Sequence, residues 1–121
     1  MEKSITFIGD EYRDLIRSRK ITAYIMLRNY VQEPCRVGEV LRLNVFDPKG
    51  EALQCVAKVT VVKVRFYPLM QFEYPDLVAA GFASTDEVIQ KFCGAYPSVI
   101  NRDTDMIWVG WRDVIPQGGG V

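Results

Sequence analysis

Residues 53–66 read LQCVAKVTVVKVRF and carry the longest strand signal in the chain. Apolar residues alternate with polar ones through Ala57, Val59 and Val61, and the alternation resumes in the opposite phase from Val62. Because successive side chains of a strand point to opposite faces, a slip of one residue exchanges the two faces. We therefore predict one long strand with a bulge or sharp bend at residues 61 and 62, a device that closes small barrels.

Shorter segments on both sides of this stretch also have strand character. The alternation predicts further strands at about residues 4–8, 20–28, 39–46 and 105–112. Between the strands at 39–46 and 53–66, the sequence Asp47-Pro48-Lys49-Gly50 predicts a tight turn. Along these strands polar and apolar residues alternate, as expected for a sheet with a core on one face, so we expect one curved or closed sheet.

Helical spacing and capping residues predict two or three helices. One covers about residues 11–18 after Asp10 as N-cap, a second runs from Pro75 to Gly81, and a third runs from the Ser84–Glu87 capping box to Gly94. The resulting order of strand, helix, three strands, two helices and strand excludes a simple alternating parallel fold. We expect an α+β domain, a small mixed β-barrel with two to three flanking helices.

The 121 residues, 49% of them hydrophobic, fit a single domain that we place at residues 1–115. Residues 116–121, with glycines at 118–120, predict a flexible C-terminal tail. We see neither a signal peptide nor an apolar run of membrane-spanning length, and expect a cytoplasmic protein without membrane contact.

The chain contains no histidine, which removes the commonest general base and the commonest metal ligand. Its three cysteines, Cys35, Cys55 and Cys93, are widely separated and lack the spacing of a metal site. We expect reduced thiols in apolar surroundings, no bound metal and no cofactor.

The net charge of zero hides an asymmetry between the two halves of the sequence. Residues 1–65 hold 12 Lys and Arg against 8 Asp and Glu, whereas residues 66–121 hold 3 against 7. An asymmetry of this kind indicates a basic face that meets phosphates, or equally a solvated surface.

Six short segments, in chain order, are similar to landmarks of ASCH domains, which belong to the PUA-like β-barrel superfamily. They are Ile5-Thr6-Phe7, Ser18-Arg19-Lys20, Gly38-Glu39-Val40-Leu41-Arg42, Asp47-Pro48-Lys49-Gly50, Ala80-Gly81-Phe82-Ala83-Ser84 and Ala95-Tyr96-Pro97. The resemblance implies a PUA-like fold and recognition of RNA or nucleotides through a cleft beside the first helix and second strand.

Some small bacterial members of this family are amidohydrolases that remove the acetyl group from acetylcytidine. Their pattern has a lysine, a threonine three residues later, an arginine two beyond that, and a glutamate just before the second capped helix. Here the lysine position is Lys20, but the other three positions are Ala23, Ile25 and Ala80. The resemblance therefore implies that most of the catalytic groups are missing.

Three functions remain open from the sequence. In the first, the chain binds RNA or a nucleotide through a basic rim and an aromatic residue that stacks on a base. The residues expected in this role are Arg17, Arg19, Lys20, Arg28, Lys63 and Arg65 for phosphates and Tyr24 or Phe72 for the base.

In the second, a hydrolase acts on a modified nucleoside through a rearranged set of Lys20, Thr22 and Glu73 or Asp76. In the third, the chain binds a protein partner through Trp108, Trp111 and the segment 66–68, although burial in the barrel is the favoured explanation for at least Trp108.

Overall fold

The computed structural model describes residues 3–28, 34–95 and 100–117. Its centre is one mixed sheet with the strand order β1-β3-β4-β5-β2. The strands are β1 (Lys3–Ile8), β2 (Ala23–Leu27), β3 (Val40–Asp47), β4 (Ala52–Pro68) and β5 (Asp105–Pro116). β1 and β3 are parallel, and the other neighbouring pairs are antiparallel. The predicted α+β fold with one curved sheet is confirmed.

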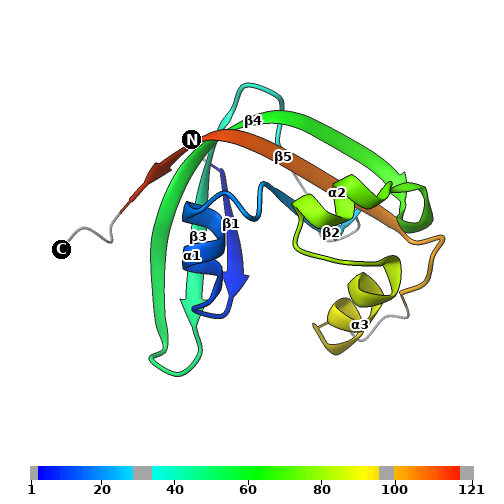
Figure 1. The fold of residues 1–121 in the computed structure, drawn as a ribbon, viewed down its shortest axis with the longest axis horizontal. Coiled ribbons are helices and arrows are strands. Elements are labelled where there is room, and N and C mark those ends of the chain that lie inside the picture. The colour runs from blue at the N-terminus through cyan, green and yellow to red at the C-terminus, as the bar shows by residue number, and fades with distance from the viewer. Residues whose placement is uncertain (1–2, 29–33, 96–99, 118–121) are drawn as a thin grey trace.

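The sheet curls into a half-barrel because β4 and β5 are long and bent (Figure 1). Their pairing shifts register between Val61 and Lys63, where the sequence predicts a bulge, and again between Lys58 and Thr60. A third shift lies between Leu43 and Asn44 in the pairing of β3 with β4. Each extra residue increases the local twist, which lets two strands arch across both halves of the molecule.

In the described ranges three helices cover the half-barrel: α1 (Tyr12–Arg17), α2 (Tyr74–Ala79) and α3 (Thr85–Ala95), with a 3-10 turn at Leu69–Gln71. Figure 1 shows α1 at one end of the sheet and α2 and α3 at the other. They enclose two hydrophobic cores. Ile16 of α1 packs with Leu41 and Leu43, whereas α2 and α3 pack on β2, Leu69 and Trp108.

The helix positions agree with the sequence, but two caps differ. Glu11 is the N-cap of α1, while the predicted cap Asp10 instead pairs with Arg13 at 3.4 Å. At α3 the Ser84 hydroxyl accepts a bond from the N–H of Glu87 at 3.2 Å, as in a capping box. The Glu87 carboxylate, however, accepts from the N–H of Ala83, one residue earlier than a capping box requires.

The C-terminal strand passes the predicted domain boundary. β5 continues to Pro116, and the N–H of Gln117 donates to the carbonyl of Val56 at 3.0 Å. The rest of the predicted tail, residues 118–121, lies outside the described residues. Within the described ranges, the structure has no helix long and apolar enough to cross a membrane.

Cys35 and Cys55 are free thiols, and each is half-buried rather than enclosed in a core. Burial raises the pKa of the Cys35 thiol, so that little thiolate forms at neutral pH. The side chain of Cys93 is outside the described part of the chain.

Candidate functional site

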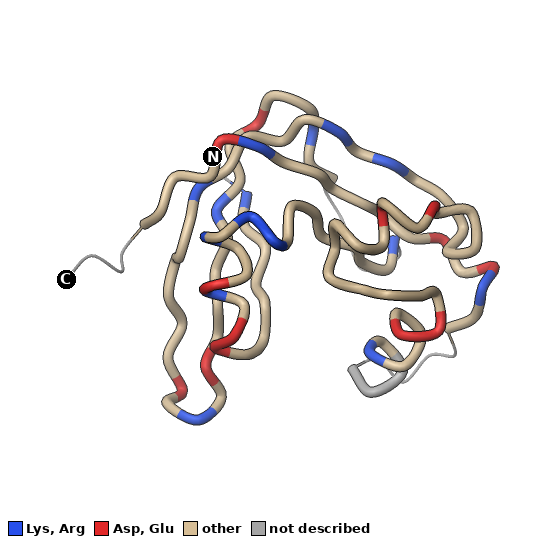
Figure 2. Tube along the Cα trace, viewed as in Figure 1, with Lys and Arg blue, Asp and Glu red and all other residues tan. Residues whose placement is uncertain are grey.

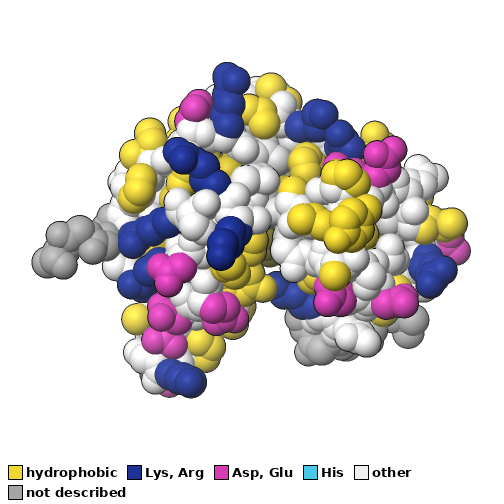
Figure 3. Space-filling model, viewed as in Figure 1, with side chains coloured by type: hydrophobic (Ala, Val, Ile, Leu, Met, Phe, Trp, Pro, Cys, Tyr) yellow, Lys and Arg dark blue, Asp and Glu magenta, His cyan; other side chains and the backbone are white. Residues whose placement is uncertain are grey.

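A cleft of about 260 Å³ lies between the edge of the half-barrel and α3. Figure 3 shows the surface hollowed between the half that carries α1 and the half that carries α2 and α3. β1 and β2 form one wall, and α3 with the segment after α2 forms the other. The lining residues are Thr6, Phe7, Ile8, Tyr24, Ile25, Met26, Ala80, Phe82, Lys91 and Phe92.

Lys91 is the one cation among the lining residues that the structure describes. Its ammonium donates to the hydroxyl of Tyr12 at 2.7 Å, which links α3 to α1. It also lies 4.8 Å from the ring centroid of Tyr12 and 5.4 Å from that of Phe82. Ring faces at these distances attract a cation, and they hold the ammonium at the cleft.

Aromatic rings form much of the remaining lining. Phe7 and Tyr24 meet edge to face, with ring centroids 5.0 Å apart, and Phe82 and Phe92 face them from the other wall. Among the described residues of the lining there is no Asp, Glu or Cys. Phe7 and Phe92 are buried, whereas Tyr24 and Phe82 are half-buried and keep part of their ring surface accessible. Among its described residues the cleft therefore offers two partly accessible rings and one positive charge, but no carboxylate that would act as an acid or base.

The start of β2 and the end of α2 are held together at the cleft. The N–H of Thr22 donates to the carbonyl of Ala79 at 2.8 Å. Gly81 has a φ of +91°, and a Cβ there would lie 3.1 Å from the Ile21 side chain. Glycine accepts this left-handed backbone and the close approach, so the chain can turn directly beside β2.

Three of the four positions that correspond to the catalytic residues of the amidohydrolases lie together at this cleft. Ile25 and Ala80 line the cleft, and Ala23 is fully buried beside them. Lys20 is exposed on the turn before β2 and is not part of the lining. At the cleft, the positions that hold polar catalytic residues in the amidohydrolase pattern are therefore apolar in this chain.

The rearranged catalytic set does not assemble in the cleft. Neither Lys20, Thr22 nor Glu73 lines it. Glu73 is the exposed N-cap of α2, where its side chain and that of Asp76 form a capping box.

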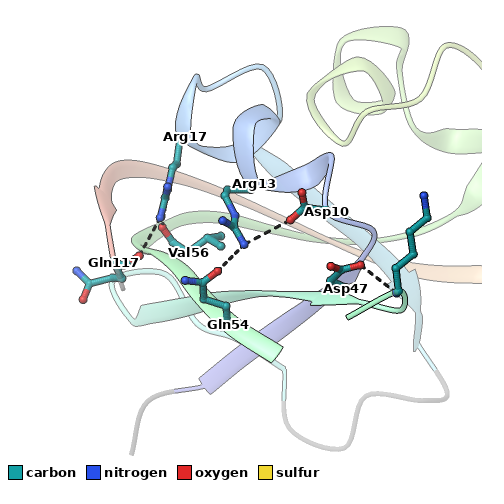
Figure 4. A network of polar contacts seen from close by, with 8 residues as sticks. Asp10, Arg13, Arg17, Asp47, Gln54, Val56 and Gln117 are labelled. Carbon is teal, nitrogen blue, oxygen red and sulfur yellow. Dashed lines mark hydrogen bonds and ion pairs between the residues drawn. The ribbon is translucent and has the colours of Figure 1, made fainter. Parts of the chain in front are cut away.

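Some residues of the predicted basic rim form contacts within the protein, and the others are exposed to solvent. Arg17 donates to the carbonyls of Val56 at 3.2 Å and Gln117 at 2.9 Å, so it points onto the sheet, as Figure 4 shows. Arg65 donates to Asp76 at 2.8 Å and lies 5.3 Å from the centroid of the Trp108 ring. Both side chains stabilise the fold.

The remaining basic residues of the predicted rim are exposed. The Arg28 guanidinium lies 4.7 Å from the centroid of the Phe66 ring, while Arg19, Lys20 and Lys63 extend toward solvent. Figure 2 shows Lys and Arg distributed over both halves of the molecule. Four of the six basic residues predicted for the rim are therefore exposed, and Arg17 and Arg65 are engaged within the fold.

Of the two aromatic residues predicted to stack on a base, only one lines the cleft. Tyr24 lines the cleft, but Phe72 is 5% exposed and packs against Tyr67, with ring centroids 5.3 Å apart. Phe72 therefore offers no open face to a base. Trp108 and Trp111 are buried as well, which corrects the partner surface suggested from the sequence and leaves only its segment 66–68 accessible.

Sequence reasoning missed Tyr12, Phe82 and Lys91. One signal was present, because Lys91 is one of only 3 basic residues after residue 65. The sequence around Lys91 does not indicate that its side chain contacts Tyr12, which is 79 positions away. Within the described ranges, no group of three or more Cys, Asp or Glu side chains could hold a metal ion.

No family model and no curated protein matches this sequence. Solved structures do match it. A DUF984 protein from Enterococcus faecalis V583 superposes with a TM-score of 0.72 at 14% identity, covering 100% of this chain and 85% of that chain. The ASCH domain from Lactobacillus crispatus JV V101 gives 0.66 at 16% identity, covering 95% and 80%.

The ASCH protein of Zymomonas mobilis gives a TM-score of 0.64 at 12% identity, covering 95% of this chain and 69% of that chain. The chain therefore has the ASCH-like, PUA-like fold that the resemblance implied. At these identities the likeness defines the fold, and function is argued from the site itself.

Proposed function

We propose that this chain is an RNA- or nucleotide-binding module without the amidohydrolase activity of related enzymes. The observation that carries the proposal is the cleft in which the Lys91 ammonium lies among aromatic rings. Aromatic side chains stack on bases, and an ammonium binds a phosphate or a base carbonyl. The volume of about 260 Å³ lies just under the range of about 300–1,000 Å³ usual for ligand pockets, which favours a single base with its sugar.

Hydrolysis of an amide needs more than the cleft provides. It requires an activated nucleophile, a proton donor for the leaving amine and a group that stabilises the oxyanion. The hydroxyls of Thr6 and Tyr24 and the ammonium of Lys91 line the cleft, but no carboxylate stands beside them among the lining residues that the structure describes.

We therefore expect no release of acetate from acetylcytidine above the uncatalysed rate, measured by an acetate assay on the purified chain. Release that is abolished by Lys20→Ala would contradict this expectation. It would favour the rearranged hydrolase that uses Lys20, Thr22 and Glu73.

The exposed turn before β2 predicts a salt-dependent contribution to binding. Arg19 and Lys20 lie on this turn, and a hydrogen bond joins Thr22, two residues later, to Ala79, the neighbour of the lining residue Ala80. If both contact phosphates, replacing both with alanine reduces RNA affinity and lowers the slope of log K against log salt by about 1.4 for a single strand. Because both side chains are exposed, the thermal midpoint stays nearly unchanged.

Fluorescence anisotropy with short single-stranded and structured RNAs measures this effect. A matched control is Lys49→Ala with Arg102→Ala, which removes the same charge from two exposed sites away from the cleft lining. No binding of RNA, DNA or nucleoside at low salt would instead favour a protein partner.

A protein partner is the second candidate function, and an exposed apolar surface favours it. Tyr74 and Val78 lie one turn apart on α2 and are 66% and 44% exposed. Figure 3 shows hydrophobic side chains gathered over α2. This surface is separate from the cleft lining, so mutations in the two places distinguish the two functions.

A further inference from the structure

The cleft lies at the open seam of the half-barrel, between the two edge strands of the sheet. In the order β1-β3-β4-β5-β2, each of β1 and β2 has a neighbour on one side only among the described strands. Both line the cleft, and each contributes three consecutive residues, 6–8 and 24–26. Consecutive side chains point to opposite faces of a strand, so a cavity that all three contact lies at the strand edge rather than over one face.

The register of β2 shows which of its backbone groups point to the cleft. The N–H of Trp111 donates to the carbonyl of Thr22 at 3.0 Å, directly before the continuous register of β2 with β5. In an antiparallel pair, residues that exchange hydrogen bonds alternate with residues that do not. Tyr24 therefore bonds to β5 as Thr22 does. The N–H and carbonyl of Ile25 point away from β5, toward the cleft that Ile25 lines.

These two groups of Ile25 have no hydrogen-bond partner among the described residues. Ile25 is nevertheless 2% exposed, and its side chain belongs to the core that contains Phe92 and Trp108. Buried backbone groups are almost always hydrogen-bonded, because an unpaired one gives up its bonds to water and gains none. A donor and an acceptor therefore lie side by side at the cleft, and a bound ligand can satisfy both.

The opposite wall of the cleft also presents backbone groups. The N–H of Gly9 donates to the carbonyl of Phe46 at 2.9 Å, which sets the phase of the parallel pair β1 and β3. In that phase the N–H and carbonyl groups of Thr6 and Ile8 point to the open edge. Both residues are exposed, whereas Ile25 is almost fully buried. The pair on Ile25 is therefore the one that solvent reaches least.

A flat ligand at the edge of β2 has an aromatic ring on each side. The side chains of β2 alternate between the two cores, so that Tyr24 packs with the core under α1 and Ile25 with the core under α2 and α3. Phe82 packs against the same core as Ile25. Tyr24 and Phe82 therefore lie on opposite sides of the plane in which β2 forms hydrogen bonds. A nucleobase matches this geometry, because its donors and acceptors lie in the ring plane and its faces stack.

On the basis of the proposed function, we propose that the cleft binds an unpaired base by its Watson–Crick edge, through the N–H and carbonyl of Ile25. Each of the four bases carries a donor next to an acceptor on this edge, so the base pairs with β2 as a neighbouring strand does. Tyr24 and Phe82 then contact its two faces. Because a duplex already uses this edge, the ligand is single-stranded or has its base flipped out.

Methylation of the base tests this pairing directly. Calorimetry measures the four nucleoside monophosphates, and the tightest is compared with the form methylated on the ring nitrogen of the Watson–Crick edge, N3 of a pyrimidine or N1 of a purine. The control is altered away from that edge, as the 5-methyl pyrimidine or the 7-deaza purine. Where the monophosphates bind too weakly, the same bases are placed in a single-stranded RNA of about six nucleotides.

We expect methylation on the edge to weaken binding by at least about tenfold, because it blocks a hydrogen bond and leaves a buried group of Ile25 unpaired. The control base binds within about twofold of the unmodified base.

An ester in place of the amide at residue 25 tests the protein side. The corresponding α-hydroxy acid keeps the isoleucine side chain and removes the N–H, so we expect binding to weaken by about fivefold or more. The control is the same replacement at Tyr24, whose N–H bonds to β5. It lowers the thermal midpoint more than the ester at residue 25 does, and leaves ligand affinity within about twofold.

Equal binding of the edge-methylated and unmodified bases would overturn the inference, and so would wild-type affinity in the residue 25 ester. Both results leave the proposed function intact, since a ligand still binds. Failure of all four monophosphates and of the single-stranded RNAs to bind would remove the proposed function and the inference together.

Discussion

Replacing Asp76 with alanine is expected to lower the free energy of unfolding by about 3 kcal/mol. Asp76 is 9% exposed, and its carboxylate accepts bonds from Arg65 at 2.8 Å and from the N–H of Glu73 at 3.3 Å. Without it, the Arg65 guanidinium stays over the Trp108 ring with no balancing charge. We expect the lower end of the range for buried pairs because the Arg65 side chain is 25% exposed.

Chemical denaturation measures this loss. The matched control is Asp86→Ala, because Asp86 pairs with Arg102 at 3.5 Å and both side chains are about two-thirds exposed, at 68% and 67%. Exposed pairs of this kind contribute less than about 1 kcal/mol. Equal losses in the two variants would show that the Asp76 pair does not hold α2 on the sheet.

Replacing Lys91 with methionine is expected to weaken RNA or nucleotide binding by about tenfold or more. The substitution removes the charge that the cleft lining provides and keeps a similar stem, while hydrogen bonds from charged groups contribute about 1.5–3 kcal/mol. Since Lys91 is exposed, loss of its bond to Tyr12 changes the free energy of unfolding by less than about 1 kcal/mol.

Titration of the ligand by fluorescence or calorimetry measures the effect. Lys49→Met is the control for loss of one exposed charge, and Lys91→Arg tests whether a cation at this position is sufficient. The proposal requires that Lys49→Met binds like the wild-type chain and that Lys91→Arg keeps most of the affinity. Unchanged binding by Lys91→Met would exclude its ammonium as a ligand contact.

The fold could be predicted from the sequence because its signals are local. The phase slip at Val61 and Val62 is visible as a change of alternation, and the structure places a register shift there. The turn at residues 47–50 and the helix after Glu73 likewise depend on residues next to one another. The N-cap of α1 is Glu11 rather than Asp10, and the Glu87 carboxylate accepts from the N–H of Ala83 rather than that of Ser84, so each prediction was wrong by a single residue.

The candidate site could be predicted only in part, because its contacts join distant segments. Tyr24, which the sequence predicts to stack on a base, lines the cleft, whereas Lys91 lines it from α3 and contacts Tyr12 on α1. Arg17 and Arg65 have the same sequence signature as surface cations, yet backbone carbonyls and Asp76 hold them. Their partners are 11 or more positions away, so composition alone cannot identify them.

The central claim is that a base occupies the cleft between β1, β2 and α3. Chemical-shift mapping of the isotope-labelled chain during titration with a short single-stranded RNA at low salt tests it most directly. We predict shifts at residues 6–8, 24–26, 82 and 91. Shifts confined to the exposed face of α2 around Tyr74 and Val78, or no shifts at saturating RNA, would contradict it.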